Sequence, residues 1–167
     1  MKISSKYLNI ICVTIILLSF HKLSAKEILH KRLTKKEGLI SNTIYKVVQD
    51  SFGNIWMATG FGVSKYNGKT YEHFTSADGL SDNDIISVHK DSKGRIWFFG
   101  YRGTACFWLN GVIYNERNFP FLKNIKTNYC FISLFEDSKK RIWLGSYGET
   151  LVVNQELTQL FPSLALP

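Results

Sequence analysis

The 167-residue chain is moderately basic, with 21 Lys and Arg residues against 13 Asp and Glu residues and a formal net charge of +8. The basic excess is concentrated in residues 26–36 and 138–141 and does not form a stripe interleaved with aromatic residues. Solvated ends and turns account for such a distribution, so the sequence predicts no nucleic-acid partner. Attraction to an acidic polysaccharide stays open as an alternative.

Residues 1–25 have the pattern of a Sec signal peptide. Lys2 and Lys6 precede an apolar run over residues 8–20, and Leu23-Ser24-Ala25 forms a small-residue cleavage site. The apolar run is shorter than the about 20 residues that span a membrane, although an uncleaved anchor stays open. We therefore predict a periplasmic protein. Cleavage would leave 18 basic and 13 acidic residues, a charge of +5.

A seven-residue segment then occurs three times. It reads Asp-Ser-Phe-Gly-Asn-Ile-Trp at 50–56, Asp-Ser-Lys-Gly-Arg-Ile-Trp at 91–97 and Asp-Ser-Lys-Lys-Arg-Ile-Trp at 137–143. The offsets are 41 and 46 residues, and the extra five fall between Asn110 and Asn128, where a loop around 116–124 can absorb them. A period of about 40 residues with several short β-rich runs is typical of a four-stranded propeller blade.

The chain divides on this pattern into five segments. A leading strand or latch segment is expected at 26–37, because residues 33–39 match residues 74–80 at the 41-residue offset. In a closed propeller such a strand completes the last blade. Blade 1 is expected at 38–78, blade 2 at 79–126 and blade 3 at 127–167.

Strands are assigned from β-branched and aromatic runs that turn residues separate, with Asn-Gly hairpin signals at 67–68 and 110–111. In blade 1 they are expected at 44–49, 55–59, 63–66 and 70–74; in blade 2 at 85–89, 96–99, 104–109 and 112–114; in blade 3 at 131–135, 142–145, 150–153 and, more weakly, 158–161. The predicted fold class is all-β: an incomplete β-propeller of about three four-stranded antiparallel blades after an N-terminal signal peptide.

The repeated residues receive structural roles. The tryptophans are expected to fill the gaps between neighbouring blades, with an aromatic platform for sugars as the alternative. The aspartates are expected to form Asx turns, and the glycines that follow them to take positive φ. These structural residues are Asp50, Gly53, Trp56, Asp91, Gly94, Trp97, Asp137 and Trp143. Lys140 occupies the glycine position of the third copy.

The pattern Gly-Leu-x-x-Asn-x-Ile, Asp-x-x-Gly-x-Ile-Trp, Gly-x-Val and Tyr-Asn-Gly resembles the two-component regulator propeller repeat. Residues 38–68 carry it, residues 79–111 carry it with deviations, and residues 127–154 carry an eroded form. That family typically forms paired propellers in the periplasmic sensor region of hybrid two-component histidine kinases, frequently in bacteria that sense glycan fragments. The resemblance therefore implies a sensor region, and the chain has far fewer repeats than the family's propellers.

Catalytic chemistry finds no support in the sequence. His30, His73 and His89 share no metal-ligand spacing with carboxylates or cysteines, and neither a Gly-x-Ser-x-Gly elbow nor a phosphate-binding glycine loop occurs. We therefore predict no enzyme, no cofactor and no metal. Cys106 and Cys130 are expected to be free thiols facing the core, with a disulfide as the alternative.

Binding is expected instead at loops that converge on one propeller face. Aromatic and Arg side chains in the second-to-third strand loops suit stacking on sugar rings, and amides before each first strand suit hydrogen bonds to hydroxyls. The candidate ligand-binding residues are Phe61, Tyr101, Arg102, Tyr147, Asn42, Asn83 and Asn128. The alternative is that they are ordinary loop residues, with the asparagines capping turns.

Three blades are fewer than the roughly 4 to 8 that close a propeller. We therefore expect a non-catalytic periplasmic ligand-sensing segment, the N-terminal fragment of a two-component sensor that responds to glycan-derived ligands. Its partners would be an oligosaccharide and the parent sensor's missing blades and kinase, with membrane contact only through that parent or an uncleaved signal. The alternatives are a stand-alone exported module that self-associates through open blade edges, and a fragment of a propeller enzyme that degrades polysaccharides.

Overall fold

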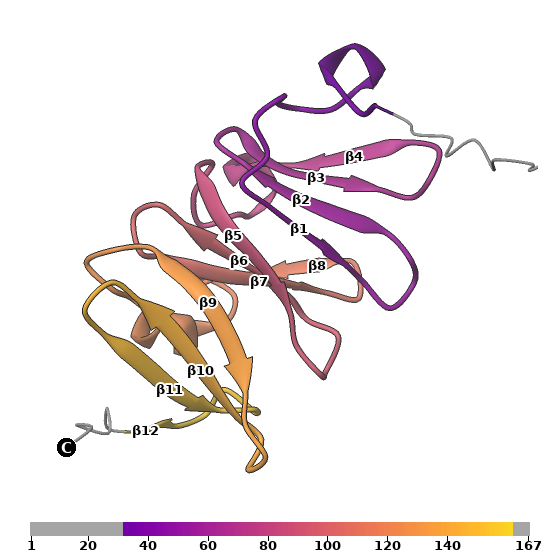
Figure 1. Cartoon of the computed structure of the whole chain (residues 1–167). Coiled ribbons are helices and arrows are strands. Elements are labelled where there is room, and N and C mark those ends of the chain that lie inside the picture. Colours follow the sequence, from indigo (N-terminus) through magenta and orange to yellow (C-terminus); the bar gives the residue numbers. More distant parts are fainter. Residues whose placement is uncertain (1–31, 162–167) are drawn as a thin grey trace, which may run out of the picture. The chain divides into compact units, whose positions relative to one another are not determined.

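The computed structural model describes residues 32–161, which fold into three antiparallel sheets of four strands each (Figure 1). The predicted signal peptide, residues 26–31 of the predicted latch, His30 and residues 162–167 lie outside the described part. No helix in residues 32–161 is long and apolar enough to cross a membrane. The prediction of an all-β fold built from three antiparallel blades is confirmed.

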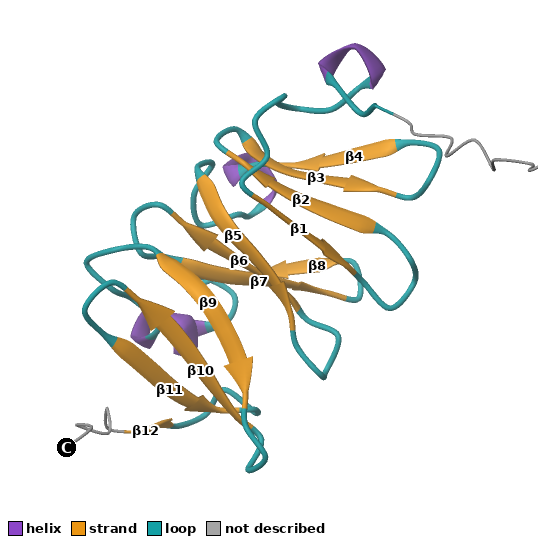
Figure 2. Cartoon of the chain, viewed as in Figure 1, coloured by secondary structure: helices purple, strands orange, loops and turns teal. Residues whose placement is uncertain are grey.

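Each sheet is a meander in which strands that are consecutive in the sequence pair with one another (Figure 2). Sheet 1 contains β1 (Lys46–Gln49), β2 (Ile55–Thr59), β3 (Gly62–Tyr66) and β4 (Tyr71–Phe74). Sheet 2 contains β5 (Ile85–Lys90), β6 (Ile96–Gly100), β7 (Ala105–Leu109) and β8 (Val112–Tyr114). Sheet 3 contains β9 (Phe131–Glu136), β10 (Arg141–Ser146), β11 (Thr150–Asn154) and β12 (Leu160–Phe161).

The strand β12 is shorter than the sequence suggests, because Asn154 organises a turn before it. The Asn154 side-chain oxygen accepts the backbone N–H groups of Thr158 and Gln159, at 2.8 and 2.9 Å. These Asx-type bonds hold the chain out of the ladder until Leu160.

The described end of the predicted latch segment is not a strand. It contains the 3-10 helix η1 (Lys35–Glu37), which Thr34 caps and Gly38 ends at φ 103°. The equivalent segment before sheet 2 is η2 (Ser76–Asp78), which Thr75 caps in the same way. The sequence match between residues 33–39 and 74–80 therefore reflects a shared capping box.

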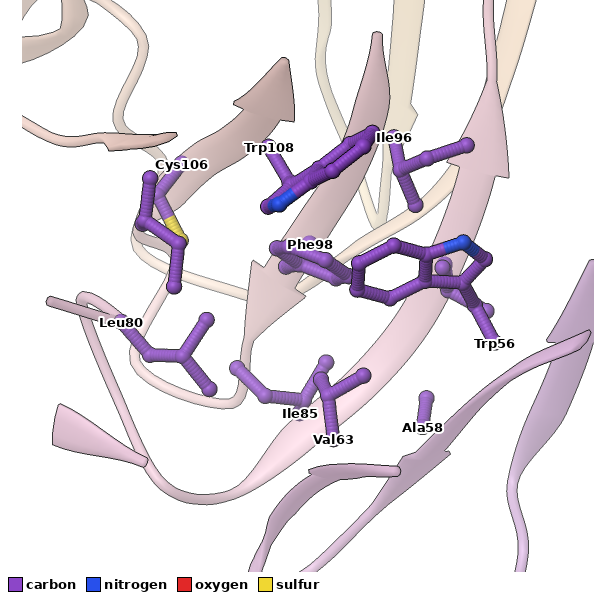
Figure 3. Packing of buried hydrophobic residues seen from close by; sticks show 11 residues of the cluster. Trp56, Ala58, Val63, Leu80, Ile85, Ile96, Phe98, Cys106 and Trp108 are labelled. Atoms are coloured by element: carbon purple, nitrogen blue, oxygen red, sulfur yellow. The ribbon is translucent and has the colours of Figure 1, made fainter. Parts of the chain in front are cut away.

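Two apolar clusters hold neighbouring sheets together. Trp56 of sheet 1 is fully buried against sheet 2, with ring centroids 5.6 Å from Phe98 and 5.1 Å from Trp108, and Figure 3 shows its ring pointing toward both. Trp97 of sheet 2 is equally buried, in a cluster that Phe131, Ile142 and Leu144 of sheet 3 complete. Burying rings of this size is the main contribution to sheet packing.

Trp143 differs from the other two tryptophans. Its side chain is only half-buried, although it was expected to pack between blades in the same way. Trp143 belongs to neither of the clusters that join sheets. Among residues 32–161, no further sheet packs on that face of sheet 3 to bury its ring.

The five extra residues between the second and third copies of the repeat form part of a compact insertion. Between β8 and β9 the chain contains the 3-10 helix η3 (Pro120–Asn124). Leu122 and Ile125, which are 3% and 1% exposed, belong to the cluster between sheets 2 and 3. The insertion is therefore anchored in the core and does not hang as a free loop.

Candidate functional site

The aspartate of each repeat organises its own turn. Asp50 Oδ1 accepts the backbone N–H groups of Phe52 and Asn54, both at 2.9 Å, and Oδ2 accepts the Trp56 indole N–H at 2.9 Å. Desolvation alone would raise the pKa of Asp50, but hydrogen bonds from Asn54 and Trp56 outweigh it and lower the pKa. A carboxylate held ionised by several donors is poorly suited to proton transfer at neutral pH.

The other two aspartates have the same arrangement with an added arginine. Asp91 Oδ1 accepts the N–H of Lys93 and of Arg95, both at 3.0 Å, and the Arg95 guanidinium pairs with Oδ2. Asp137 pairs with Arg141 at 2.6 Å in the equivalent place. Desolvation opposes ionisation of Asp137, but the bonds from Arg141 and Trp143 hold its pKa well below the usual range. These residues form turns and are not a reactive cluster.

The predicted loop aromatics lie at one end of the three sheets. Phe61, Tyr101 and Tyr147 occupy the β2–β3, β6–β7 and β10–β11 loops and are 66%, 64% and 64% exposed. Arg102 is exposed beside Tyr101. Since the strands alternate in direction, the β4–β5 and β8–β9 connections reach the same end (Figure 1). Within residues 32–161 the three rings stack on no other aromatic ring, so they project from the loops separately.

Two of the three predicted asparagines cap turns. Asn42 Oδ1 accepts the Lys35 N–H at 2.8 Å, and Asn83 Oδ1 accepts the Ser76 N–H at 2.7 Å. Each side-chain oxygen therefore accepts a turn hydrogen bond, as the alternative interpretation expected. Asn128 is exposed at the equivalent position before β9.

Two acidic residues that the sequence analysis did not select lie at the same end. Asp82 Oδ1 accepts the Asp84 N–H at 3.2 Å, and the Asp84 carbonyl accepts the Tyr101 N–H at 2.8 Å. The carboxylate oxygens Asp82 Oδ2 and Asp84 Oδ1 are buried, and neither has a hydrogen-bond partner in the described part of the chain. Burial raises the pKa of Asp84, and the neighbouring Asp82 charge raises it further.

Aligning the repeats would have found these acids. The residue before each connecting asparagine is Ser41, Asp82 or Thr127, and each side chain accepts the N–H two residues later. Blade 2 alone uses carboxylates there, since Asp84 aligns with Thr43 and Tyr129.

The insertion before β9 forms one wall of a groove at this end. The groove has a cavity volume of about 170 Å³, and the β4–β5 connection forms its opposite wall. Asn115 joins the two walls by donating to the Gly79 carbonyl at 2.8 Å. The lining residues are Ser76, Gly79, Leu80, Ser81, Thr104, Asn115, Glu116 and Arg117. A smaller depression continues from it past Lys123 and Lys126.

Thr104 lines both depressions. Its hydroxyl oxygen is buried and has no hydrogen-bond partner among residues 32–161, so it is not open to a ligand in the groove. Glu116 is the one carboxylate that lines the groove, and the basic residues Arg117, Lys123 and Lys126 border it. The groove therefore offers hydroxyl and cationic contacts to a polar ligand.

Cysteine and metal chemistry add nothing to this site. Cys106 is buried and free, and burial raises the pKa of its thiol to about 11. Cys130 is also free but only half-buried, one residue before β9, which corrects the expectation that it faces the core. Within residues 32–161 no three His, Cys, Asp or Glu side chains gather as a metal site.

A family model described as the two-component regulator propeller matches residues 38–61, 79–102 and 124–148. These segments include the three Asp-to-Trp turns and the loops after them. The chain belongs to the two-component regulator propeller repeat family. The comparison with curated proteins gave no match.

Solved structures of two proteins from B. thetaiotaomicron share the fold of this chain. The extracellular domain assigned to the hybrid two component system BT3049 is 25% identical with a TM-score of 0.59, over 76% of this chain and 18% of that one. A structure of the extracellular domain assigned to the hybrid two component system BT4673 is 15% identical with a TM-score of 0.63, over 86% of this chain and 19% of that one. The two-component regulator propeller chain thus spans about a fifth of these structures.

Proposed function

We propose that this two-component regulator propeller chain is a non-catalytic, periplasmic segment of a sensor that responds to a glycan-derived ligand. The observation that carries the proposal is the match of all three repeats to a regulator family, together with the likeness to extracellular domains of sensor systems. Export through residues 1–25 is part of the proposal and agrees with the extracellular position of those domains.

The glycan part of the proposal is supported by the groove and the loop aromatics. A volume of about 170 Å³ is below the roughly 300–1,000 Å³ of sites that enclose a drug-sized ligand. It suits one sugar unit at the end of a chain, with further units reaching toward exposed rings such as Tyr101. Ser76 and Ser81 would meet sugar hydroxyls, and Arg117 and Lys126 would favour an acidic sugar.

Hydrolysis of such a ligand is disfavoured by the placement of the carboxylates. Asp82 and Asp84 do not line the groove, where Glu116 is the one carboxylate. A glycosidase needs two carboxyl groups that face one pocket, about 5–9.5 Å apart. Binding without turnover is therefore the function that the groove supports best.

Titration calorimetry of the full chain with a panel of neutral and uronate-containing oligosaccharides tests the proposal. We expect one of them to bind, and we expect Arg117→Ala, which removes an exposed cation that lines the groove, to weaken it about tenfold. Tyr101→Ala and Arg102→Ala should weaken it to a similar extent if the chain of sugars reaches the β6–β7 loop. Lys69→Ala, in the hairpin at the other end of sheet 1, is the matched control.

Each other result has a definite meaning. If Tyr101→Ala and Arg102→Ala leave the affinity unchanged while Arg117→Ala lowers it, the loop residues are removed from the site and the groove remains. If no oligosaccharide binds, the proposed ligand class is wrong. Release of new reducing ends during incubation would establish an enzyme.

A further inference from the structure

The two walls of the groove belong to connections that join different pairs of sheets. The first wall, residues 76–81, is the connection from β4 of sheet 1 to β5 of sheet 2 (Figure 1). The second wall, residues 115–117, begins the connection from β8 of sheet 2 to β9 of sheet 3. A ligand in the groove would therefore contact both connections at once, and the spacing between the walls decides what fits.

Asn115 is the side chain that sets this spacing. Its Nδ2 donates to the Gly79 carbonyl of the first wall, and its Oδ1 accepts the Arg117 N–H of the second wall, both at 2.8 Å. Among residues 32–161, no other hydrogen bond joins residues 76–81 to residues 115–117. The two ends of one amide thus fix Arg117 relative to the opposite wall.

Each wall is folded by bonds of its own. A capping box encloses the 3-10 helix η2 of the first wall. In the second wall, Asn118 accepts the Asn115 N–H at 2.7 Å and donates to the Ile113 carbonyl at 2.8 Å. The far end of the insertion is held to sheet 2, since the Thr127 N–H donates to the Gly103 carbonyl at 3.2 Å. The bond between the walls is therefore not needed to fold either one, and it positions one against the other.

In the described chain, sheet 1 forms no such bond at the equivalent place. His73 corresponds to Asn115 by strand register, because Tyr71 and Ile113 hold the same position in β4 and β8. The His73 ring instead bonds to Ser64 of its own sheet, with Nδ1 and Oγ 3.0 Å apart. The bond between walls is therefore particular to sheet 2, where the insertion follows β8.

We propose that Asn115 is a positioning residue for the ligand, because it holds Arg117 against the β4–β5 connection at the spacing that a sugar acid spans. The inference rests on the proposed function, since it concerns the ligand of the same groove. The acid group would pair with Arg117, and sugar hydroxyls would bond to Ser76 and Ser81 on the opposite wall. The ligand and the Asn115 amide then join the same two walls, so each strengthens the other. Binding would thereby fasten together the connections between all three sheets.

Hydrogen exchange on the ligand-free full chain tests the bond between the walls. Asn115→Asp keeps the acceptor for the Arg117 N–H but, being ionised at neutral pH, has no donor for the Gly79 carbonyl. We expect the amide hydrogens of Gly79 and Leu80, which bond within the first wall, to exchange about fivefold faster in this variant. Asn118→Asp is the matched control, because it introduces the same charge and removes a donor to a carbonyl inside the second wall. It should leave the exchange of Gly79 and Leu80 unchanged.

Titration calorimetry of the full chain with a galacturonate trisaccharide tests the effect on binding. Asn115→Ala should raise the Kd about fivefold or more. Asn118→Ala should change it by less than about twofold, although its amide also makes a bond at each end. Equal rises in the two variants would mean that a loosened insertion accounts for the loss, which overturns the positioning role. Unchanged exchange of Gly79 and Leu80 in Asn115→Asp also overturns it.

The remaining outcomes separate this inference from the proposed function. An unchanged Kd in Asn115→Ala, beside binding by the wild-type chain, overturns the positioning role and leaves the glycan sensor standing. A wild-type chain that binds neutral oligosaccharides but not the galacturonate trisaccharide also overturns this inference alone. A wild-type chain that binds no oligosaccharide overturns the proposed ligand class and the role of Asn115 together.

Discussion

Asp91 accepts the indole N–H of Trp97 at 2.8 Å, which ties the β5–β6 turn to the ring that fills the space between sheets 2 and 3. The same bond joins Asp50 to Trp56 and Asp137 to Trp143, each at 2.9 Å. The six-residue spacing is therefore set by two needs at once. The aspartate closes the turn, and it also satisfies an indole donor that burial would otherwise leave unpaired.

Replacing Asp91 with alanine should destabilise the chain more than replacing Asp50. Asp91→Ala leaves the Trp97 N–H unpaired and also removes the charge partner of Arg95, which is 5% exposed. Loss of one partner of a buried ion pair costs about 3–5 kcal/mol. Asp50→Ala leaves the Trp56 indole N–H and the neutral Asn54 amide without their acceptor, which costs about 1–3 kcal/mol.

Urea denaturation of both variants measures this difference. Asp50→Ala serves as the matched control, because its turn has the same backbone bonds without an arginine. Equal losses of unfolding free energy in the two variants would show that the Arg95 charge is not held by Asp91 in solution.

His89 should make the folded state less stable as the pH falls below neutral. Burial and the Lys46 charge lower the pKa of His89 from 6.5 to about 4, against a hydrogen bond from its ring to the Ile132 carbonyl, which raises the pKa. Its Nε2 lies 2.8 Å from Lys46 Nζ and 2.9 Å from Ser87 Oγ. As the pH falls, the unfolded chain binds this proton first, so stability declines between pH 6.5 and about 4.

A His89→Gln variant isolates this effect from the carboxylates that titrate in the same region. The unfolding free energy of the variant should depend less on pH than that of the wild-type chain over this window. Denaturation curves at about pH 7 and about pH 5 give the comparison. Parallel losses of stability in the two proteins would mean that His89 is not held neutral.

The strands of sheets 1 and 2 were predictable because turn residues bracket them. β2 and β8 have the predicted limits, since Gly60 ends one and Asn110-Gly111 precedes the other. The third sheet shows the limit of the same reasoning. Trp143 repeats its sequence context, but burial depends on which sheet lies beside it, and a local motif holds no information about that neighbour.

The groove could not be predicted for a related reason. Its walls come from residues 76–81 and 115–117, which the Asn115 bond to Gly79 brings together. The sequence indicated only that the spacing between the second and third copies of the repeat is five residues longer than that between the first and second. It did not signal that Leu122 and Ile125 anchor the insertion and so position that wall.

Gly103 should tolerate no side chain. It lies in the β6–β7 loop at φ 73°, and its carbonyl accepts the Thr127 N–H at 3.2 Å. A Cβ there would collide with the backbone oxygens of Thr127 and Tyr129. Gly103→Ala must therefore move the start of blade 3 away from sheet 2, at a cost of about 2 kcal/mol or more.

Thermal unfolding of Gly103→Ala, with Gly111→Ala as the control, checks this contact. Gly111 also has a positive φ, 87°, but a Cβ there meets nothing within 4 Å. Gly111→Ala should therefore carry only the cost of the backbone conformation. Equal melting temperatures in the two variants would argue against the close approach of the loop to residues 127–129.

Lys140 occupies the one Asp-to-Trp turn in which a side chain has replaced glycine. Its φ is 61°, whereas the equivalent Gly53 and Gly94 have φ values of 87° and 79°. A left-handed conformation costs an L-residue about 1 kcal/mol and costs glycine almost nothing. Lys140→Gly should therefore raise the unfolding free energy by up to about 1 kcal/mol, even though the more flexible unfolded chain offsets part of the gain.

The reverse change in the second turn provides the test of that reasoning. A Cβ at Gly94 meets nothing within 4 Å, so Gly94→Lys adds only backbone strain and should cost about as much as Lys140→Gly gains. Urea denaturation of both variants measures the pair. Because Asp91 and Asp137 hold their turns with the same backbone bonds, opposite signs are required, and a lower stability of Lys140→Gly would contradict the left-handed turn at residue 140.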